Sequence, residues 1–201
     1  MNGAQPPTAP TVPTTPREAA EGALLDAAER LLVSVGYAAV TTRRLAEEAG
    51  VNHGLVHYYF GSMDNLLVRT LERFTQTLIA RQRAMYAAEV PFVERWREAM
   101  RYLDEDFSSG YQKVWYELQA LGWNRPEMRD RIARVTGEWY AVVREAFERG
   151  RHEHEIDIPL DALVTLVATF NQGIILERLS GIDNGHRALL DWIDEWLEAT
   201  R

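Results

Sequence analysis

The sequence predicts an all-α protein in which a small N-terminal helical domain precedes a larger helical domain. Apolar residues recur about every three or four positions along most of the chain, which is the spacing of amphipathic helices. Glycine and proline residues divide this pattern into segments of helical length. We find no segment with the strict alternation of apolar and polar residues that is typical of a strand.

Composition divides the chain into a tail and two domains. The chain has 201 residues, enough for one large or two small domains, and 46% of them are hydrophobic, so it can bury a core. Residues 1–16 are rich in Pro, Thr and Ala and hold no charged side chain, so we expect a disordered tail. Residues 17–62 form the predicted N-terminal domain, and residues 63–201 form the larger domain.

An amphipathic helix is predicted to open the N-terminal domain. Thr15, Pro16 and Glu18 match a capping box with proline at the first helical position. The helix is expected to run to about Val35 and to turn one apolar stripe toward the core. That stripe consists of Leu24, Ala27, Ala28, Leu31, Leu32 and Val35.

Two short helices joined by a tight turn are predicted between residues 41 and 60. A threonine, either Thr41 or Thr42, can cap the first helix through its hydroxyl. Gly50 can end that helix in the left-handed conformation, and Asn52 can cap the second. A short helix, a glycine turn and a second helix with a polar and aromatic outer face are typical of a helix-turn-helix.

This stretch lies within a run that resembles the DNA-binding domain of the TetR family of bacterial repressors, namely LLDAAERLLVSVGYAAVTTRRLAEEAGVNHGLVHYYFGSMDNLL. The resemblance extends from Arg17 to about Phe74, and it depends on the combined pattern of helices, turn and aromatic residues. It implies contacts with phosphates and base edges of double-stranded operator DNA. The implied DNA-binding residues are Thr42, Arg43, Arg44, Asn52, His53, Gly54, Leu55, His57, Tyr58 and Tyr59.

Three positions depart from the usual pattern of the family. The family often has Tyr at the position of His57, a small residue at that of Leu55 and Lys at that of Met63. Leu55 can instead contact a thymine methyl group. The operator sequences of other members therefore do not transfer to this chain.

The acidic charge of the chain limits the expected electrostatic attraction to DNA. The sequence has 22 Lys and Arg against 30 Asp and Glu, a net charge of −8, whereas DNA-binding domains usually present a basic surface. Arg43 and Arg44 nevertheless lie near His53 and His57, while most acids of this domain lie on the first helix. We therefore expect a small, local set of phosphate contacts.

Helices are predicted throughout the larger domain. The first begins after Ser62 and runs to about Ala88, so it belongs to both domains and links them mechanically. Others are predicted over residues 92–106, 111–122, 126–149, 160–179 and 188–199, with a loop at 151–159. This succession resembles, in architecture, the ligand-binding and dimerisation domain of the TetR family.

Large aromatic residues are concentrated in the larger domain. Core packing is the alternative for any single ring, but the set, together with the resemblance, favours a cavity for a small apolar or aromatic effector. Asn171 interrupts an apolar helix and can hydrogen-bond to a ligand. The candidate pocket residues are Trp96, Phe107, Tyr111, Trp115, Trp139, Phe170 and Asn171.

The last two helices carry more apolar residues than one domain face needs, which is typical of a partner surface. The resemblance implies a symmetric four-helix bundle between two subunits of a homodimer. The candidate interface residues are Val167, Ile174, Ile175, Leu179, Trp192 and Trp196.

A run of His and Glu residues in the predicted loop could suggest a metal site. His152 and His154 alternate with Glu153 and Glu155, and imidazole with carboxylate suits zinc or nickel. No second ligand cluster lies nearby in the sequence, so a solvated loop is the preferred interpretation. We therefore expect no metal and no cofactor.

The sequence favours a cytoplasmic location. It contains no Cys, which excludes disulfides and fits a reducing compartment. We expect no apolar run long and uncharged enough to span a bilayer, and the first residues do not match a signal peptide. No membrane partner is therefore expected.

Taken together, these features predict a ligand-responsive transcriptional regulator, not an enzyme, with repression as the expected sign. It would bind a palindromic operator as a homodimer and be released by a small-molecule effector. Two alternatives stay open from the sequence. One is a small helical metal-dependent enzyme that uses the His/Glu run, and the other is a helical interaction protein without a DNA role.

Overall fold

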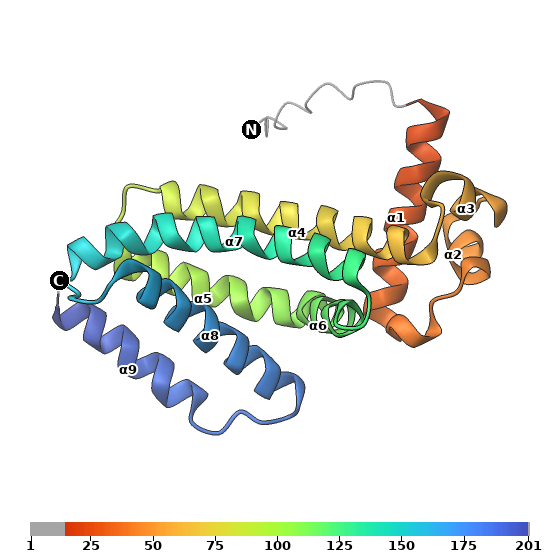
Figure 1. The fold of residues 1–201 in the computed structure, drawn as a ribbon. Coiled ribbons are helices and arrows are strands. Elements are labelled where there is room, and N and C mark those ends of the chain that lie inside the picture. Colours follow the sequence, from red (N-terminus) through yellow and green to blue (C-terminus); the bar gives the residue numbers. More distant parts are fainter. Residues whose placement is uncertain (1–14, 201) are drawn as a thin grey trace, which may run out of the picture.

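The computed structural model describes residues 15–200, which form nine α-helices and one 3₁₀ turn without a strand (Figure 1). This confirms the predicted all-α fold class. The helices are α1 Pro16–Val35, α2 Thr42–Ala49, α3 Gly54–Phe60, α4 Met63–Ala87, α5 Phe92–Ser108, α6 Tyr111–Gly122, α7 Pro126–Glu153, α8 Leu160–Leu179 and α9 His186–Ala199, and the 3₁₀ turn η1 is Tyr37–Ala39. Of the tail expected at residues 1–16, only Thr15 and Pro16 lie within the described residues, where they begin α1.

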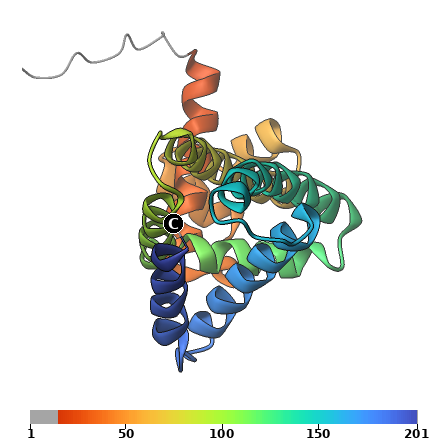
Figure 2. The same cartoon turned by 90° about the vertical axis from the view of Figure 1, so that its left-hand side faces the viewer.

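The long helices α4 and α7 lie side by side, and α1, α2 and α3 are gathered at one end of them (Figure 1). α8 packs on α7, and α9 packs on α5. Figure 2 shows α8 and α9 converging at an edge of the molecule away from the start of α1. The helix-turn-helix and the last two helices therefore occupy opposite parts of the molecule.

The predicted capping signals at the start of the chain are confirmed. The Thr15 hydroxyl accepts a hydrogen bond from the backbone N–H of Glu18 at 3.2 Å. The Glu18 carboxylate accepts in return from the Thr15 N–H at 2.8 Å. This N–H and the Thr15 hydroxyl, which donates to the same carboxylate oxygen at 2.9 Å, lower the pKa of Glu18. The reciprocal bonds satisfy donors that a helix N-terminus would otherwise leave free, so they fix where α1 begins.

One hydrophobic core joins the N-terminal domain to the start of the larger domain. It combines residues of α1, α2, α3 and the first half of α4 with Val114 and Leu118 of α6 and with Met128 and Ile132 of α7. Leu118 is completely buried, and burial of a side chain of that size contributes about 1.5–3 kcal/mol. The core therefore crosses the boundary expected at residue 62 and ties the two domains together.

The end of α7 differs from the prediction. The sequence predicts a stop at about Arg149, because glycine often ends a helix, and a loop over residues 151–159. The helix instead continues to Glu153. Gly150 is buried, and a Cβ built on it would lie 2.5 Å from Cε2 of Phe92. The glycine at this position therefore allows close packing on the Phe92 ring and does not terminate the helix.

α8 also corrects an expectation. From the sequence we expect no segment able to span a bilayer. By length and composition alone, however, the 20 residues of α8 could span one, since an 18-residue stretch of this helix has a mean hydropathy of 1.3. Charged residues occur near its ends, at Asp161, Glu177 and Arg178, so its middle is uncharged. Only 28% of that 18-residue stretch is buried within the molecule. α8 therefore leaves apolar side chains exposed along the outer side of the larger domain.

Candidate DNA-binding surface and effector cavity

The geometry of α2 and α3 follows from caps in the sequence. The Thr41 hydroxyl accepts from the backbone N–H of Arg44 at 3.2 Å, so Thr41 caps α2. Gly50 takes a left-handed conformation with φ +66° and ends α2. Asn52 Oδ1 accepts from the Gly54 N–H at 2.9 Å and stabilises the start of α3. These local bonds hold the two short helices in a helix-turn-helix.

The proposed DNA-contacting residues fall into an exposed group and a half-buried group. Thr42, Leu55 and Tyr59 are half-buried, and Leu55 and Tyr59 pack against the N-terminal core. The other predicted contacts lie on the exposed surface, and they are Arg43, Arg44, Asn52, His53, Gly54, His57 and Tyr58. The outer surface of α2 and α3 is therefore polar and free, as a recognition surface requires.

The aromatic pair on α3 combines one exposed ring with one anchored ring. Tyr58 is 72% exposed, whereas Tyr59 packs inward and has the Arg17 guanidinium 5.9 Å from its ring centroid. The two rings meet edge to face at 5.1 Å. Tyr59 thus holds α3 against α1, and Tyr58 is the large side chain that α3 offers to a partner.

The two arginines of α2 have different partners. Arg43 Nε donates to Glu47 Oε1 at 2.8 Å, a bond that raises the pKa of the Arg43 guanidinium. Arg44 Nη1 instead donates to the Ala39 carbonyl oxygen at 3.1 Å. Within residues 15–200 the Arg44 guanidinium has no carboxylate partner, so its positive charge is the less neutralised of the two.

Ion pairs attach α4 to α1. Arg69 contacts Glu21, and Arg73 contacts both Asp26 at 2.8 Å and Glu29 at 3.1 Å. The carboxylates on this side of α1 are therefore directed at α4. They also make α4 the element through which a displacement in the larger domain reaches the N-terminal domain.

Two arginines near α7 reinforce this connection. Arg125 contacts Asp64 at 3.1 Å, at the start of α4. Arg131 of α7 contacts Glu72 at 2.6 Å and also Asn65. Since the Asn65 side chain donates to the Phe60 carbonyl oxygen at 2.8 Å, these contacts lead from α7 to the end of α3.

The larger domain contains a partly open cavity of about 100 Å³ between α4, α5, α6, α7 and α8. Of the predicted pocket residues, Trp96, Tyr111, Trp115, Trp139 and Asn171 line it. The other lining aromatic residues, which the sequence analysis did not select, are Tyr86, Tyr116 and Phe147. Aromatic residues therefore make up about a third of the residues that line the cavity.

Two predicted pocket residues lie outside the cavity. The Phe107 ring is covered by the Arg178 guanidinium, 4.2 Å from its centroid. Phe170 packs against the hydrophobic core of the larger domain. Both rings are part of the packing around the cavity and not of its wall.

Apart from Asp106, the polar side chains that line the cavity are neutral. The Tyr111 hydroxyl and the Thr75 hydroxyl are 3.0 Å apart. Burial raises the pKa of Tyr86 to about 12 and the pKa of Tyr116 to about 12, and it raises that of Tyr111 as well. The three phenols are therefore uncharged at neutral pH.

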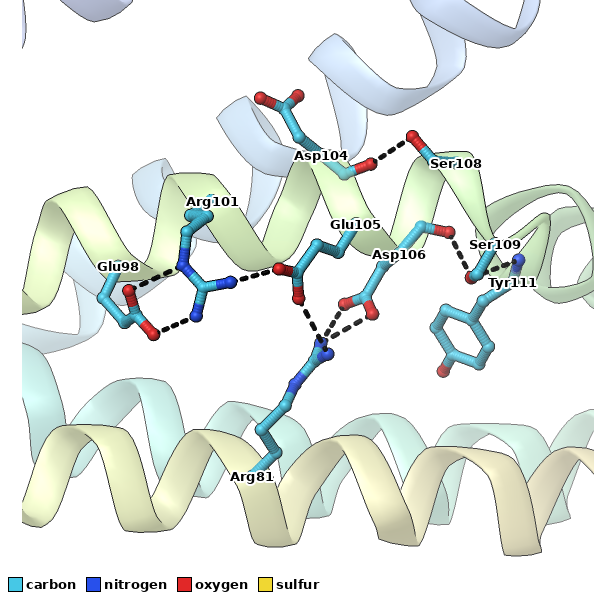
Figure 3. Close-up of polar contacts among 9 residues, drawn as sticks. All are labelled: Arg81, Glu98, Arg101, Asp104, Glu105, Asp106, Ser108, Ser109 and Tyr111. Carbon is cyan, nitrogen blue, oxygen red and sulfur yellow. Dashed lines mark hydrogen bonds and ion pairs between the residues drawn. The ribbon is translucent and has the colours of Figure 1, made fainter. Parts of the chain in front are cut away.

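Asp106, near the end of α5, also lines the cavity. Both of its carboxylate oxygens accept from Nη2 of Arg81 at 2.6 Å (Figure 3). The Arg81 guanidinium stacks on the Tyr102 ring at 4.1 Å. Asp106 was not predicted, because nothing in the local pattern of α5 distinguishes it from the exposed acids beside it.

The predicted interface residues are divided between the interior and the surface. Ile174 and Ile175 are buried against Leu103, and Val167 lines the cavity. Leu179, Trp192 and Trp196 are exposed. Further large apolar side chains are exposed on α8, α9 and the turn between them, and these are Leu166, Leu176, Ile182 and Leu189.

The side chains of the His/Glu run diverge. His152 meets Glu148 at 3.2 Å, and Glu153 meets Arg95 at 3.1 Å. His154 is buried and has Nδ1 3.0 Å from the Thr200 hydroxyl. Among residues 15–200 no three His, Asp or Glu side chains are placed to hold a metal ion together.

Comparisons with known proteins agree with this geometry. The family model for bacterial regulatory proteins of the tetR family matches residues 24–70, which cover most of α1, all of α2 and α3, and the first turns of α4. The HTH-type transcriptional regulator BetI 1 of Chromohalobacter salexigens is 26% identical over 185 residues, or 87% of this chain and 88% of that protein.

Solved structures share the fold across both domains. A regulator from Saccharomonospora viridis in complex with choline has a TM-score of 0.69 at 22% identity, covering 90% of this chain and 94% of that one. FadR from Bacillus subtilis in complex with stearoyl-CoA has a TM-score of 0.71 at 16% identity, covering 88% and 96%. The matched helix-turn-helix and the regulator relative lead to one conclusion: this chain is a DNA-binding transcriptional regulator whose residues 24–70 form a DNA-binding domain of the tetR family of bacterial regulatory proteins.

Proposed function

We propose that this regulator represses transcription as a cytoplasmic homodimer on a palindromic operator and leaves the DNA when a small effector fills the cavity of the larger domain. The observation that carries the proposal is the connection between the two sites. An exposed recognition surface on α2 and α3 is joined through α4 to a helix bundle that encloses an aromatic cavity.

The recognition part of the proposal assigns phosphate and base contacts by position. Arg44 and the residues that begin α2 and α3 are suited to phosphates, because side chains and N–H groups at helix starts bind anions. His53, His57 and Tyr58 are exposed on α3 and can reach base edges in a major groove. Gly54 carries no side chain, so backbone and DNA can approach closely there.

The effector part is supported by the cavity and by related structures. Choline and stearoyl-CoA are bound in two proteins of the same fold. The cavity of this chain is small, at about 100 Å³. We therefore propose a compact effector that packs on aromatic rings.

The switch would be a population shift between two spacings of the recognition helices. Two α3 helices fit successive major grooves only when they are about 34–36 Å apart. An effector that favours a different position of α4 would change that spacing. A tenfold loss of DNA affinity requires only about 1.4 kcal/mol of differential binding.

Homodimerisation is proposed on the exposed apolar surface of α8 and α9. Leu166, Leu176, Trp192 and Trp196 together leave a large apolar area open in a single subunit, and surfaces of this kind mark protein interfaces. The same surface lies away from the start of α1, so a dimer formed there leaves α2 and α3 free for DNA (Figure 2).

A binding measurement with the DNA upstream of the chain's own gene tests the proposal. Fluorescence anisotropy of a labelled duplex should give tight binding by the wild type and at least tenfold weaker binding by Tyr58→Ala. The exposed Tyr58 ring can be removed without loss of fold, which circular dichroism would verify. Equal affinity of both proteins for this duplex and for unrelated DNA would contradict the proposal.

A further inference from the structure

The cavity of the larger domain has a distinctive charge. Among the described residues that line it, Asp106 is the one with a formal charge, and seven lining side chains are aromatic. The tyrosines of the wall are neutral because burial raises the pKa of each. An occupant of this cavity therefore meets aromatic faces and one carboxylate, and no lining side chain of positive charge.

The carboxylate of Asp106 is only partly neutralised. Arg81 contacts Asp106 at 2.6 Å and also Glu105 at 3.7 Å. Arg101 in turn contacts both Glu98 and Glu105. Figure 3 shows these two guanidinium groups among three carboxylates, so the cluster retains one negative charge. Burial raises the pKa of Asp106 although Arg81 acts to lower it, which agrees with incomplete compensation.

We propose that the cavity binds a small organic cation, held by the faces of its aromatic residues and by the Asp106 carboxylate, and that this cation competes with Arg81 for Asp106. This inference rests on the proposed function, because it names the chemical class of the effector and the contact through which the effector acts.

Aromatic faces and a carboxylate select for positive charge together. The face of an aromatic ring is negative and attracts organic cations such as quaternary ammonium groups, most strongly where water is excluded. An anionic ligand would meet Asp106 without a lining cation to offset it. A neutral apolar ligand would pack on the rings but would leave the excess charge of the cluster unchanged.

Competition for Asp106 gives the cation a path to the DNA-binding domain. Arg81 lies on α4, the helix whose first half packs on α1, whereas Asp106 lies on α5. Asp106 and Arg81 also both line a surface groove between α1, α4 and α5. When a cation shares Asp106, Arg81 keeps Glu105, and the link between α4 and α5 changes.

Calorimetric titration with tetramethylammonium chloride tests the ligand class. tert-Butanol has the same number of non-hydrogen atoms and a similar shape without the charge, and potassium chloride controls for ionic strength. At pH 8, the wild type should bind tetramethylammonium at least tenfold more tightly than tert-butanol. Equal binding of the two, or binding of neither, would overturn the proposal.

Two substitutions test the role of Asp106. Asp106→Asn should weaken tetramethylammonium binding at least tenfold and leave tert-butanol binding unchanged. Asp104→Asn is the matched control, because Asp104 lies on the same helix but contacts Arg178 and does not line the cavity, and it should retain the wild-type affinity. Unchanged affinity of Asp106→Asn would overturn the assignment of the carboxylate.

Arg81→Gln tests the competition, because it removes the rival cation. Tetramethylammonium should then bind several-fold more tightly. A purely structural role of the Arg81–Asp106 pair predicts weaker or unchanged binding, and that result would show that the ligand does not compete with Arg81. Operator affinity of the ligand-free wild type is measured in parallel. Retained operator binding without cation binding contradicts only the ligand class, whereas absent operator binding contradicts the proposed function.

Discussion

Two glycines of α7 show how the surroundings of a residue decide what it contributes. Gly137 is exposed, and a Cβ built on it would meet no atom within 4 Å. Gly150 is buried against the Phe92 ring, where a Cβ would lie 2.5 Å from Cε2 and 2.6 Å from Cδ2. Both residues lie inside the same helix, so helix propensity alone assigns them the same effect.

We predict opposite effects on stability for alanine at these two positions. Gly137→Ala should raise the free energy of unfolding by about 0.5–1 kcal/mol, because alanine reduces the freedom of the unfolded chain. Gly150→Ala should lower it by about 1–3 kcal/mol, because the methyl group overlaps a ring that cannot move away freely. Thermal unfolding of both variants beside the wild type measures this, and a stabilised Gly150→Ala would refute the packing role.

The two arginines of helix α2 differ in whether their charge is paired with a carboxylate. Arg43 is paired with Glu47 on the same helix, and Arg44 donates to a backbone carbonyl while keeping its charge unpaired among the described residues. Exposed pairs such as Arg43–Glu47 contribute little to stability. The arrangement matters more for DNA binding, because it leaves Arg44 as the phosphate contact.

We predict that Arg44→Ala weakens binding to all DNA sequences alike and lowers the slope of log affinity against log salt by about 0.9, the value for one phosphate contact. Arg83→Ala is the control, since Arg83 is also exposed but lies near the C-terminal end of α4. Anisotropy titrations at several salt concentrations give both slopes. A changed sequence preference with an unchanged slope would assign Arg44 to a base instead.

The elements differ in how far the sequence could predict them. Helices α6 and α8 match their predicted bounds, because apolar spacing and nearby glycine or proline residues mark both ends. The predicted end of α7 was wrong, because a glycine near the end of a helical pattern usually indicates a helix terminus. The contact of Gly150 with Phe92, which is distant in the sequence, cannot be predicted from a local pattern. Long-range packing decides such boundaries.

The same distinction holds for the candidate sites. The exposed positions on α3 follow from helical periodicity, which places Val56 and Phe60 inside and His57 and Tyr58 outside. The cavity depends on how five helices pack together. Aromatic composition therefore predicted both Trp115, which lines the cavity, and Phe107, which does not, and it gave no indication of Asp106. Sequence reasoning therefore places a recognition surface better than it places a cavity.

The whole molecule carries a net charge of −8, yet α3 has no acid, and the two acids of α2, Glu47 and Glu48, are paired with Arg43 and Arg30. Those of α1, including Glu21, Asp26 and Glu29, are paired with arginines of α4. Apolar residues are distributed just as unevenly, because α8 and α9 hold several exposed ones on one edge. One part of the molecule is thus suited to DNA and another to a second copy of the chain.

We predict that Trp192→Glu converts the homodimer to a monomer. Trp192 is 60% exposed on α9, and a buried, unpaired carboxylate at a subunit interface costs more free energy than such an interface can offset. Trp123→Glu is the matched control, because Trp123 is 70% exposed at the end of α6 and outside the proposed interface. Sedimentation at micromolar concentration measures both, and a monomeric wild type would contradict the dimer.

In the proposed homodimer, two recognition helices at a fixed distance read two half-sites on one face of the DNA. Operator affinity measured as a function of half-site spacing tests it most directly. Insertion of about 5 bp between the half-sites turns one of them to the opposite face of the duplex, since a helical turn is roughly 10 bp. We expect this insertion to reduce affinity to the level of a single half-site. An insertion of about 10 bp returns both half-sites to one face but places them one helical turn further apart than roughly 34–36 Å, so affinity should stay reduced. If the half-turn insertion left affinity unchanged, the two half-sites would not be read by two recognition helices at a fixed distance.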